Sequence, residues 1–185
     1  LDAGKHLWVY NTDIRLEDPN GHAITIYNDV EKARIQDSTI YVGEGESNYG
    51  IIVRKDTGAV DVFDTEIQFE GTANPLLIKG YNDDRDAPVH ILRTSIWGSG
   101  DGSDGLNAIR VTRANVELED VEVRMDGDYY RRALELQGDN CLVDGGVYES
   151  THHPIVNVAN GTTIDDLTAR AYNGRQGLKL YDDYS

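Results

Sequence analysis

The chain has 185 residues, a length that fits one domain, and its 33 acidic against 17 basic residues give a formal net charge of −16. Such a surface repels the phosphates of DNA and RNA, so we expect no nucleic-acid partner. No run approaches the ~18 apolar residues of a membrane-spanning helix, so no membrane insertion is expected, and the single cysteine, Cys141, excludes an intrachain disulfide framework.

The basic residues are 12 arginines and only 5 lysines. An excess of acids with scarce lysine is similar to the composition of proteins from extreme halophiles, where molar salt screens the repulsion between surface charges. We therefore expect a protein of a halophile or of its virus. An ordinary acidic secreted protein is the alternative.

Short segments with alternating apolar residues, bounded by Gly, Asn and Asp, predict β-strands along the whole chain. One strand of each repeat carries two apolar residues at a spacing of two, which places both side chains on one face. In chain order these pairs are Ile24/Ile26, Ile51/Val53, Leu76/Ile78, Ile109/Val111, Leu134/Leu136, Val156/Val158 and Leu178/Leu180.

A second pattern also recurs, with the order apolar, any, Asp, small or apolar, any, apolar, any, apolar. Its clearest copy is residues 118–125, and its third position recurs every 22 to 29 residues, at Asn11, Asp37, Asp64, Arg93, Asp120, Asp144 and Asp166. The alternation changes register at this position, which predicts a tight bend, and Asn and Asp tolerate left-handed backbone there. We expect a structural ladder at a buried corner, in which neighbouring N–H groups hold Asn11, Asp37, Asp64, Asp120, Asp144 and Asp166.

A repeat of this period indicates a solenoid. Three strands per coil with an Asn/Asp corner resemble the right-handed parallel β-helix, the pectate-lyase-like fold, over nearly the whole chain. We predict an all-β, right-handed parallel β-helix of about seven coils, as a single domain of residues 1–185. A leucine-rich repeat would need a helical segment in each repeat, and a left-handed β-helix would need a hexapeptide rhythm; neither is visible in the sequence.

Both ends of the sequence lack an amphipathic capping helix, and no basic-then-apolar signal segment is present. Open solenoid ends expose strand edges. We therefore expect a fragment of a longer chain, with ends that further chain segments or a homotrimer would cover.

In proteins of the fold that this sequence resembles, substrates lie along the sheet formed by the first strand of each coil. Alternation places two outward rows on that sheet. They are Thr25, Ile52, Leu77, Arg110, Glu135, Asn157 and Lys179, and Tyr27, Arg54, Lys79, Thr112, Gln137, Ala159 and Tyr181. We expect a site on the late coils, because tyrosine faces pack on sugar rings and arginine binds carboxylates through paired hydrogen bonds.

The candidate catalytic residues are Tyr181, Lys179, Arg110, Glu135, His152 and His153. The candidate substrate-binding residues are Tyr129, Tyr130, Arg131, Gln137, Asn157, Tyr172 and Arg175. These types suit a lyase or epimerase acting on a uronic acid, which needs an acid, a base and a cation. Hydrolysis needs two carboxylates about 5–9.5 Å apart and is less favoured, because Glu135 is the only acid on the strand face. The alternative for each residue is a solvated, salt-bridged face.

Asp101 and Asp104, in a Gly-rich loop, are weak candidate ligands for Ca²⁺, which binds six to eight oxygens. A simple turn is the alternative, and no cofactor is expected to be required.

We expect an extracellular, cell-surface or virion module of the tailspike or secreted-enzyme type, which binds an acidic polysaccharide or surface glycan and, if it is an enzyme, cleaves or epimerises it. A non-catalytic structural rod of a virion or surface assembly is the alternative.

Overall fold

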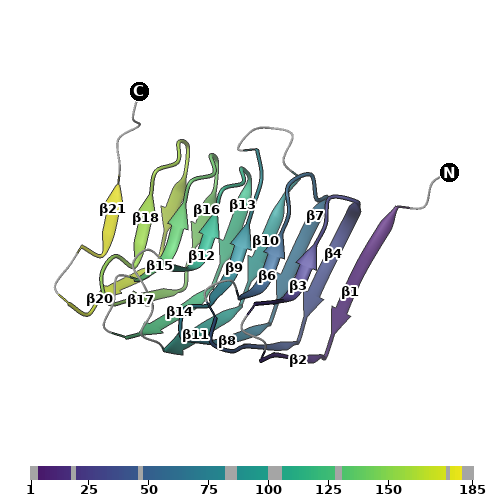
Figure 1. Ribbon diagram of the computed structural model, residues 1–185. Coiled ribbons are helices and arrows are strands. Elements are labelled where there is room, and N and C mark those ends of the chain that lie inside the picture. Colours follow the sequence, from purple (N-terminus) through teal and green to yellow (C-terminus); the bar gives the residue numbers. More distant parts are fainter. Residues whose placement is uncertain are drawn as a thin grey trace.

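The computed structural model describes residues 4–17, 20–45, 48–81, 87–99, 106–127, 131–173 and 176–180. Three parallel sheets of seven strands each stack as a β-helix with three strands per coil (Figure 1). This confirms the predicted all-β solenoid, in which the chain makes six turns between β1 and β19. The described residues contain no helix that is long and apolar enough to cross a membrane.

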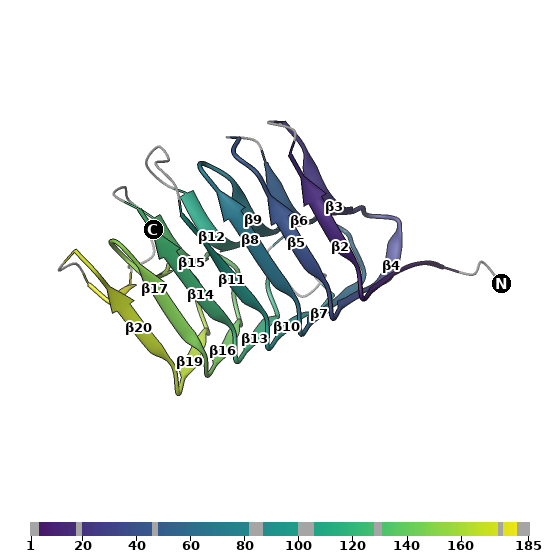
Figure 2. The same ribbon diagram turned by 90° about the horizontal axis from the view of Figure 1, so that it is seen from below.

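The strands contribute to the three sheets in strict rotation. Sheet 1 contains β1 (Lys5–Tyr10), β4 (Val30–Gln36), β7 (Ala59–Phe63), β10 (Val89–Leu92), β13 (Val116–Glu119), β16 (Leu142–Asp144) and β19 (Thr163–Asp165). Sheet 2, whose strands lie side by side in Figure 2, contains β2 (Asp13–Leu16), β5 (Thr39–Val42), β8 (Glu66–Glu70), β11 (Ser95–Ser99), β14 (Glu122–Asp126), β17 (Val147–Ser150) and β20 (Thr168–Ala171). Sheet 3 contains β3 (His22–Ile26), β6 (Tyr49–Val53), β9 (Asn74–Ile78), β12 (Leu106–Val111), β15 (Arg131–Leu136), β18 (Ile155–Asn157) and β21 (Leu178–Leu180).

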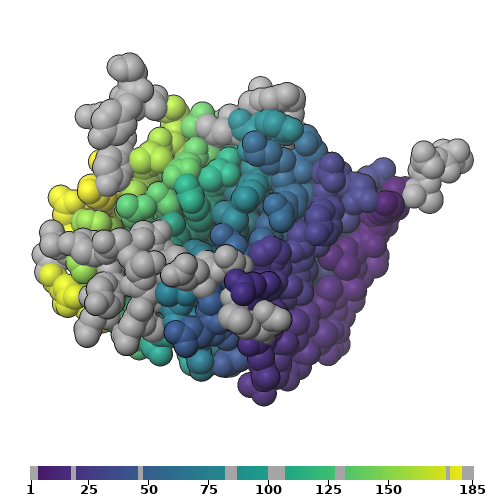
Figure 3. Space-filling view, in the orientation of Figure 1, coloured from purple at the N-terminus to yellow at the C-terminus, as the bar shows by residue number. Residues whose placement is uncertain are grey.

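The core consists of stacks of equivalent aliphatic side chains. In sheet 1 the stack is Ile35, Val62, Ile91, Leu118 and Val143, each fully buried and each in register with the next. Burying one such side chain contributes about 1.5–3 kcal/mol. Because each coil packs on its neighbours, the coils form successive bands along the solenoid (Figure 3).

The predicted bend lies between sheets 1 and 2, where the backbone takes a positive φ in every coil. The residues are Asn11, Asp37, Asp64, Arg93, Asp120, Gly145 and Asp166, with φ between 42° and 68°. The prediction that Asp144 belongs to this ladder is wrong, because Asp144 is the last residue of β16 and Gly145 makes the bend. The corner side chains are also exposed rather than buried.

Hydroxyl groups form the inner side of the same corner. Ser38, Thr65 and Thr94 follow the left-handed residues, are buried, and donate hydrogen bonds of 2.8–3.1 Å to the carbonyl two residues earlier. The corner's backbone is therefore satisfied by short hydroxyl side chains, while the Asn and Asp side chains face solvent.

A second left-handed corner, which sequence analysis missed, connects sheet 3 to sheet 1. Its residues are Asp56, Asn115, Asn140 and Gly161, with φ between 55° and 64°. Arg113 lies fully buried beside this corner. Its Nε donates to the carbonyl of Ala87 at 2.9 Å and its Nη2 donates to that of Thr57 at 2.6 Å, so one side chain connects three successive coils.

Candidate functional site

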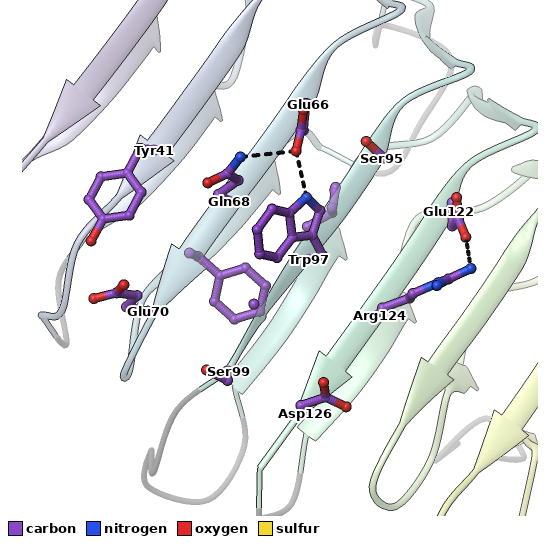
Figure 4. Close-up of a pocket in the computed structure, with 13 residues that line it drawn as sticks. Tyr41, Glu66, Gln68, Glu70, Ser95, Trp97, Ser99, Glu122, Arg124 and Asp126 are labelled. Atoms are coloured by element: carbon purple, nitrogen blue, oxygen red, sulfur yellow. Dashed lines mark hydrogen bonds and ion pairs between the residues drawn. The ribbon is translucent and has the colours of Figure 1, made fainter.

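The outer face of sheet 2 carries a groove of about 680 Å³ (Figure 4). Four neighbouring strands, β5, β8, β11 and β14, supply its lining. The lining side chains that reach outward are Tyr41, Glu66, Gln68, Glu70, Ser95, Trp97, Ser99, Glu122, Arg124 and Asp126.

The hollow exists because β11 alternates small and large outward residues. Ser95 and Ser99 leave space on either side of Trp97, whereas β8 and β14 carry longer side chains at the same levels. Glu66 and Glu122 are in register with Ser95, and Glu70 and Asp126 are in register with Ser99. Four acidic side chains therefore surround Trp97: Glu66, Glu70, Glu122 and Asp126.

Trp97 is fixed at the centre of the groove and remains 45 % exposed. Its indole Nε1 donates a 2.6 Å hydrogen bond to Oε1 of Glu66, and Nε2 of Gln68 donates to the same oxygen at 3.0 Å. An aromatic side chain that is held by its polar edge presents its apolar surface to a ligand without further ordering.

Tyr41 provides a second aromatic ring at one end of the groove. It lies in the same outward row as Trp97, two strands away through Gln68, so the two Cα atoms are separated by about 10 Å. The guanidinium of Arg15 lies over the Tyr41 ring at 4.9 Å. A hydrogen bond to Glu70 raises the pKa of the Tyr41 hydroxyl.

The groove is acidic, with four carboxylates against one guanidinium. That guanidinium belongs to Arg124, which forms an ion pair with Glu122 within the groove. Glu66 and Glu70 accept hydrogen bonds from Trp97 and Tyr41, respectively. The Asp126 carboxylate makes no hydrogen bond or ion pair to another residue in the described part of the chain; its charge adds to that of Glu149 in raising the pKa of Tyr172.

Tyr172, a predicted substrate-binding residue, lies on the sheet 2 side, beyond the end of β20. Its hydroxyl donates to Oε2 of Glu149 at 2.6 Å, and Nη1 of Arg170 donates to Oε1 at 2.6 Å. These interactions lower the pKa of Glu149, and the carboxylate in turn raises the pKa of Tyr172. The Tyr172 hydroxyl thus binds an acid of sheet 2 and not a residue of the predicted site on sheet 3.

Glu135, on the outer face of sheet 3, is surrounded by donors and is 7 % exposed. Its Oε2 accepts from Asn107 at 2.7 Å, and its Oε1 accepts from Arg132 at 2.7 Å and from Gln137 at 3.1 Å. Arg110 Nε lies 3.6 Å from Oε2. The structure therefore brings Arg110, Glu135 and Gln137 together as predicted, in a network that satisfies the carboxylate internally.

The rest of this face is less open than predicted. Its outward row contains Ile52, Leu77 and Val156, which are all buried. The placement of Asn157 in that row was wrong: Val156 pairs with Glu135 and Lys179, and Asn157 pairs with Leu136 and Leu180. The Asn157 side chain hydrogen-bonds the backbone of Ala159 instead.

His152 and His153 lie next to each other between β17 and β18, with ring centroids 6.4 Å apart. His152 is buried, and burial lowers the pKa of His153. Lys179 lies on β21, two strands from Glu135 in the same row. These residues share one end of the solenoid with the Glu135 network.

Six predicted site residues lie outside the described residues. They are Tyr129, Tyr130, Tyr181 and Arg175, and the proposed Ca²⁺ ligands Asp101 and Asp104. Arg131 lies in β15, but its side chain is not described. Among the residues that the structure does describe, no three His, Cys, Asp or Glu side chains are grouped to hold a metal ion.

Sequence analysis missed the groove, although one signal pointed to it. In Ser95-Ile96-Trp97-Gly98-Ser99, the buried Ile96 places Trp97 on the outer face between two serines. Comparison with protein-family models, with curated proteins and with solved structures found no match. Function is therefore inferred from the geometry of the groove.

Proposed function

We propose that this β-helix is a glycan-binding module and that the groove of sheet 2 holds the sugar chain. The observation that carries the proposal is Trp97, a half-exposed indole at the centre of the groove that is held by a hydrogen bond to Glu66. Sugar rings pack their C–H faces on aromatic rings, and carboxylates and amides bind their hydroxyl groups. Gln68 and Glu66, beside Trp97, supply groups of both kinds.

The second aromatic ring, that of Tyr41, defines the line along which the sugar chain runs. Tyr41 and Trp97 are two strands apart in one row, a separation of about 10 Å. That distance is comparable to the length of two pyranose rings joined end to end. An extended oligosaccharide therefore runs along the solenoid axis across β5, β8, β11 and β14, stacking on both rings.

The charge of the groove favours a neutral or amine-bearing glycan over the acidic polysaccharide that sequence analysis favoured. Four carboxylates would repel a uronic acid, and the one guanidinium is already paired with Glu122. The carboxylates of Glu66, Glu70 and Glu122 are each held by a donor in the free protein. Because three of the four groove carboxylates are already engaged, this arrangement supports binding of a ligand by the groove.

Replacing Trp97 by alanine tests the proposal. Oligomers of β-1,4-linked glucose and of β-1,4-linked N-acetylglucosamine are screened on an array, and the best binder is titrated by calorimetry. Loss of the stacking surface is expected to weaken binding about tenfold or more. Trp8→Ala is the matched control, because Trp8 is also 45 % exposed but lies on β1 of sheet 1. Equal losses in both variants, or no loss in Trp97→Ala, would contradict the proposed groove.

A further inference from the structure

The two halves of the groove, at the level of Ser95 and at the level of Ser99, differ in how far their acids are engaged. At the level of Ser95, the two flanking acids are engaged: Glu66 binds Trp97, and Glu122 binds Arg124. At the level of Ser99, the small serine leaves a gap between Glu70 and Asp126, with Trp97 next to it on the same strand (Figure 4). This half of the groove contains the less neutralised pair of carboxylates.

The two acids of this gap face each other across one strand. Both are in register with Ser99, so their Cα atoms are about 10 Å apart, which leaves room for a small group between two inclined carboxylates. Glu70 accepts from the Tyr41 hydroxyl, and a carboxylate has further lone pairs available. The Asp126 side chain makes no hydrogen bond or ion pair within the described residues.

We propose that the groove selects amino sugars, binding a protonated amine over Ser99 between Glu70 and Asp126 and against the edge of the Trp97 site. This inference rests on the proposed glycan-binding function and specifies its ligand class as polymers of 2-amino-2-deoxy sugars. An ammonium group gains charge-assisted hydrogen bonds from two carboxylates. It also gains attraction to the aromatic ring when it approaches a ring face.

The amine is positioned by the cavity and by the two aromatic rings, and not by the acidity of the surface alone. Acidic side chains are common over this surface, whose net charge is −16. Only an amine that is part of a sugar chain stacked on Trp97 and Tyr41 is brought to the Ser99 level repeatedly and in one orientation. Arg124 pairs with Glu122 at the Ser95 level and lies 3.8 Å from Glu149 on β17, so its ion pairs are with acids other than Glu70 and Asp126.

The test compares two oligomers of equal length, one of β-1,4-linked glucosamine and one of β-1,4-linked N-acetylglucosamine, by calorimetry at a pH at which the amines are protonated. The free amine is expected to bind about five- to tenfold more tightly. Asp126→Asn and Glu70→Gln should each remove most of that preference, so that the two oligomers bind each variant with nearly equal affinity. Asp13→Asn is the matched control, because Asp13 is an exposed acid on β2 of the same sheet and the substitution changes the net charge equally.

The control variants are essential, because an acidic chain attracts any polycation. If Asp13→Asn weakens binding of the glucosamine oligomer as much as Asp126→Asn does, the attraction is general and the amine site is refuted. Equal binding of both oligomers to the wild type would also refute amine selection while leaving the glycan groove in place. Failure of both oligomers, and of every neutral glycan on the array, would overturn the proposed function itself.

Discussion

Three carboxylates in the described part of the chain are buried, one on the outer face of each sheet. Asp61, Glu149 and Glu135 are 5–7 % exposed. Arginines neutralise all three: Arg34 on the preceding coil binds Asp61 at 2.9 Å, and Arg170 on the following coil binds Glu149 at 2.6 Å. A buried charge is tolerated only when it is paired and hydrogen-bonded, so each cluster fixes the relative position of adjacent coils.

Glu149→Gln is expected to destabilise the protein by about 1–3 kcal/mol at neutral pH, because Arg170 and Tyr172 lose a charged acceptor. The Tyr172 hydroxyl and the Arg170 guanidinium hold the pKa of Glu149 below its usual 4.5. A carboxyl whose pKa is lowered by folding stabilises the fold above the unfolded pKa, and this contribution disappears as the pH falls through the folded pKa. The difference between variant and wild type should therefore shrink below about pH 4.5.

Urea unfolding across this pH range measures the effect, with Glu31→Gln as a control, because Glu31 is exposed on β4. A difference that stays constant down to strongly acidic pH would show that the Glu149 charge does not stabilise the fold.

At the scale of the coil, the left-handed corner is the element that closes each turn. Most coils place Asn, Asp or Arg at the bend and a small hydroxyl residue or an aliphatic residue behind it, but one coil uses Gly145 and Gly146, with φ of 68° and 88°. The atom nearest to a Cβ on Gly145 would be the Oδ1 of Asp120, the end of a flexible side chain. A Cβ on Gly146 would lie 2.2 Å from the backbone oxygen of Val121.

These two glycines should therefore respond differently to substitution. Gly145→Asn is expected to cost less than ~1 kcal/mol, because Asn tolerates left-handed backbone and other coils carry Asn or Asp at this position. Gly146→Ala is expected to cost about 2 kcal/mol or more, because the backbone of the preceding coil must move. Chemical denaturation of both variants gives the comparison, and equal costs would contradict this account of the corner.

The sequence was sufficient to predict the coils because the period-2 alternation and the bend recur in each of them. It failed where strands are short. Residues 155–158 read Ile-Val-Asn-Val, so alternation fits either Ile155 and Asn157 or Val156 and Val158 as the inward pair, and the structure selects the first. The sequence could not predict which sheet carries the groove, because polar residues point outward from all three sheets. Burial of Ile52 and Leu77 on sheet 3 also depends on tertiary structure.

At the scale of the whole molecule, like charges on all three faces oppose the compact state. The net charge of −16 is distributed over a solenoid whose internal ion pairs engage only part of the 33 acids. Repulsion among exposed charges is screened strongly by salt, whereas partly buried pairs such as Arg170–Glu149 are screened much less. Added salt should therefore remove more repulsion than attraction.

The melting temperature is accordingly expected to rise between low and molar concentrations of potassium chloride, by about 2–4 °C for each kcal/mol of repulsion removed. Circular dichroism melts give the measurement. Chloride is used because sulfate stabilises proteins generally through exclusion from their surface. A melting temperature that falls with chloride would show that surface ion pairs outweigh the repulsion.

The buried Arg113 determines when, during synthesis, the early coils can complete their hydrogen bonds. Its guanidinium donates to Ala87 in the preceding coil and to Thr57 in the coil before that. Both carbonyl groups are synthesised well before the arginine, since 56 residues separate Thr57 from Arg113. The early coils thus receive their final internal donor only after two further turns have emerged. Nascent chains that stop before Arg113 should therefore be more sensitive to protease than slightly longer ones.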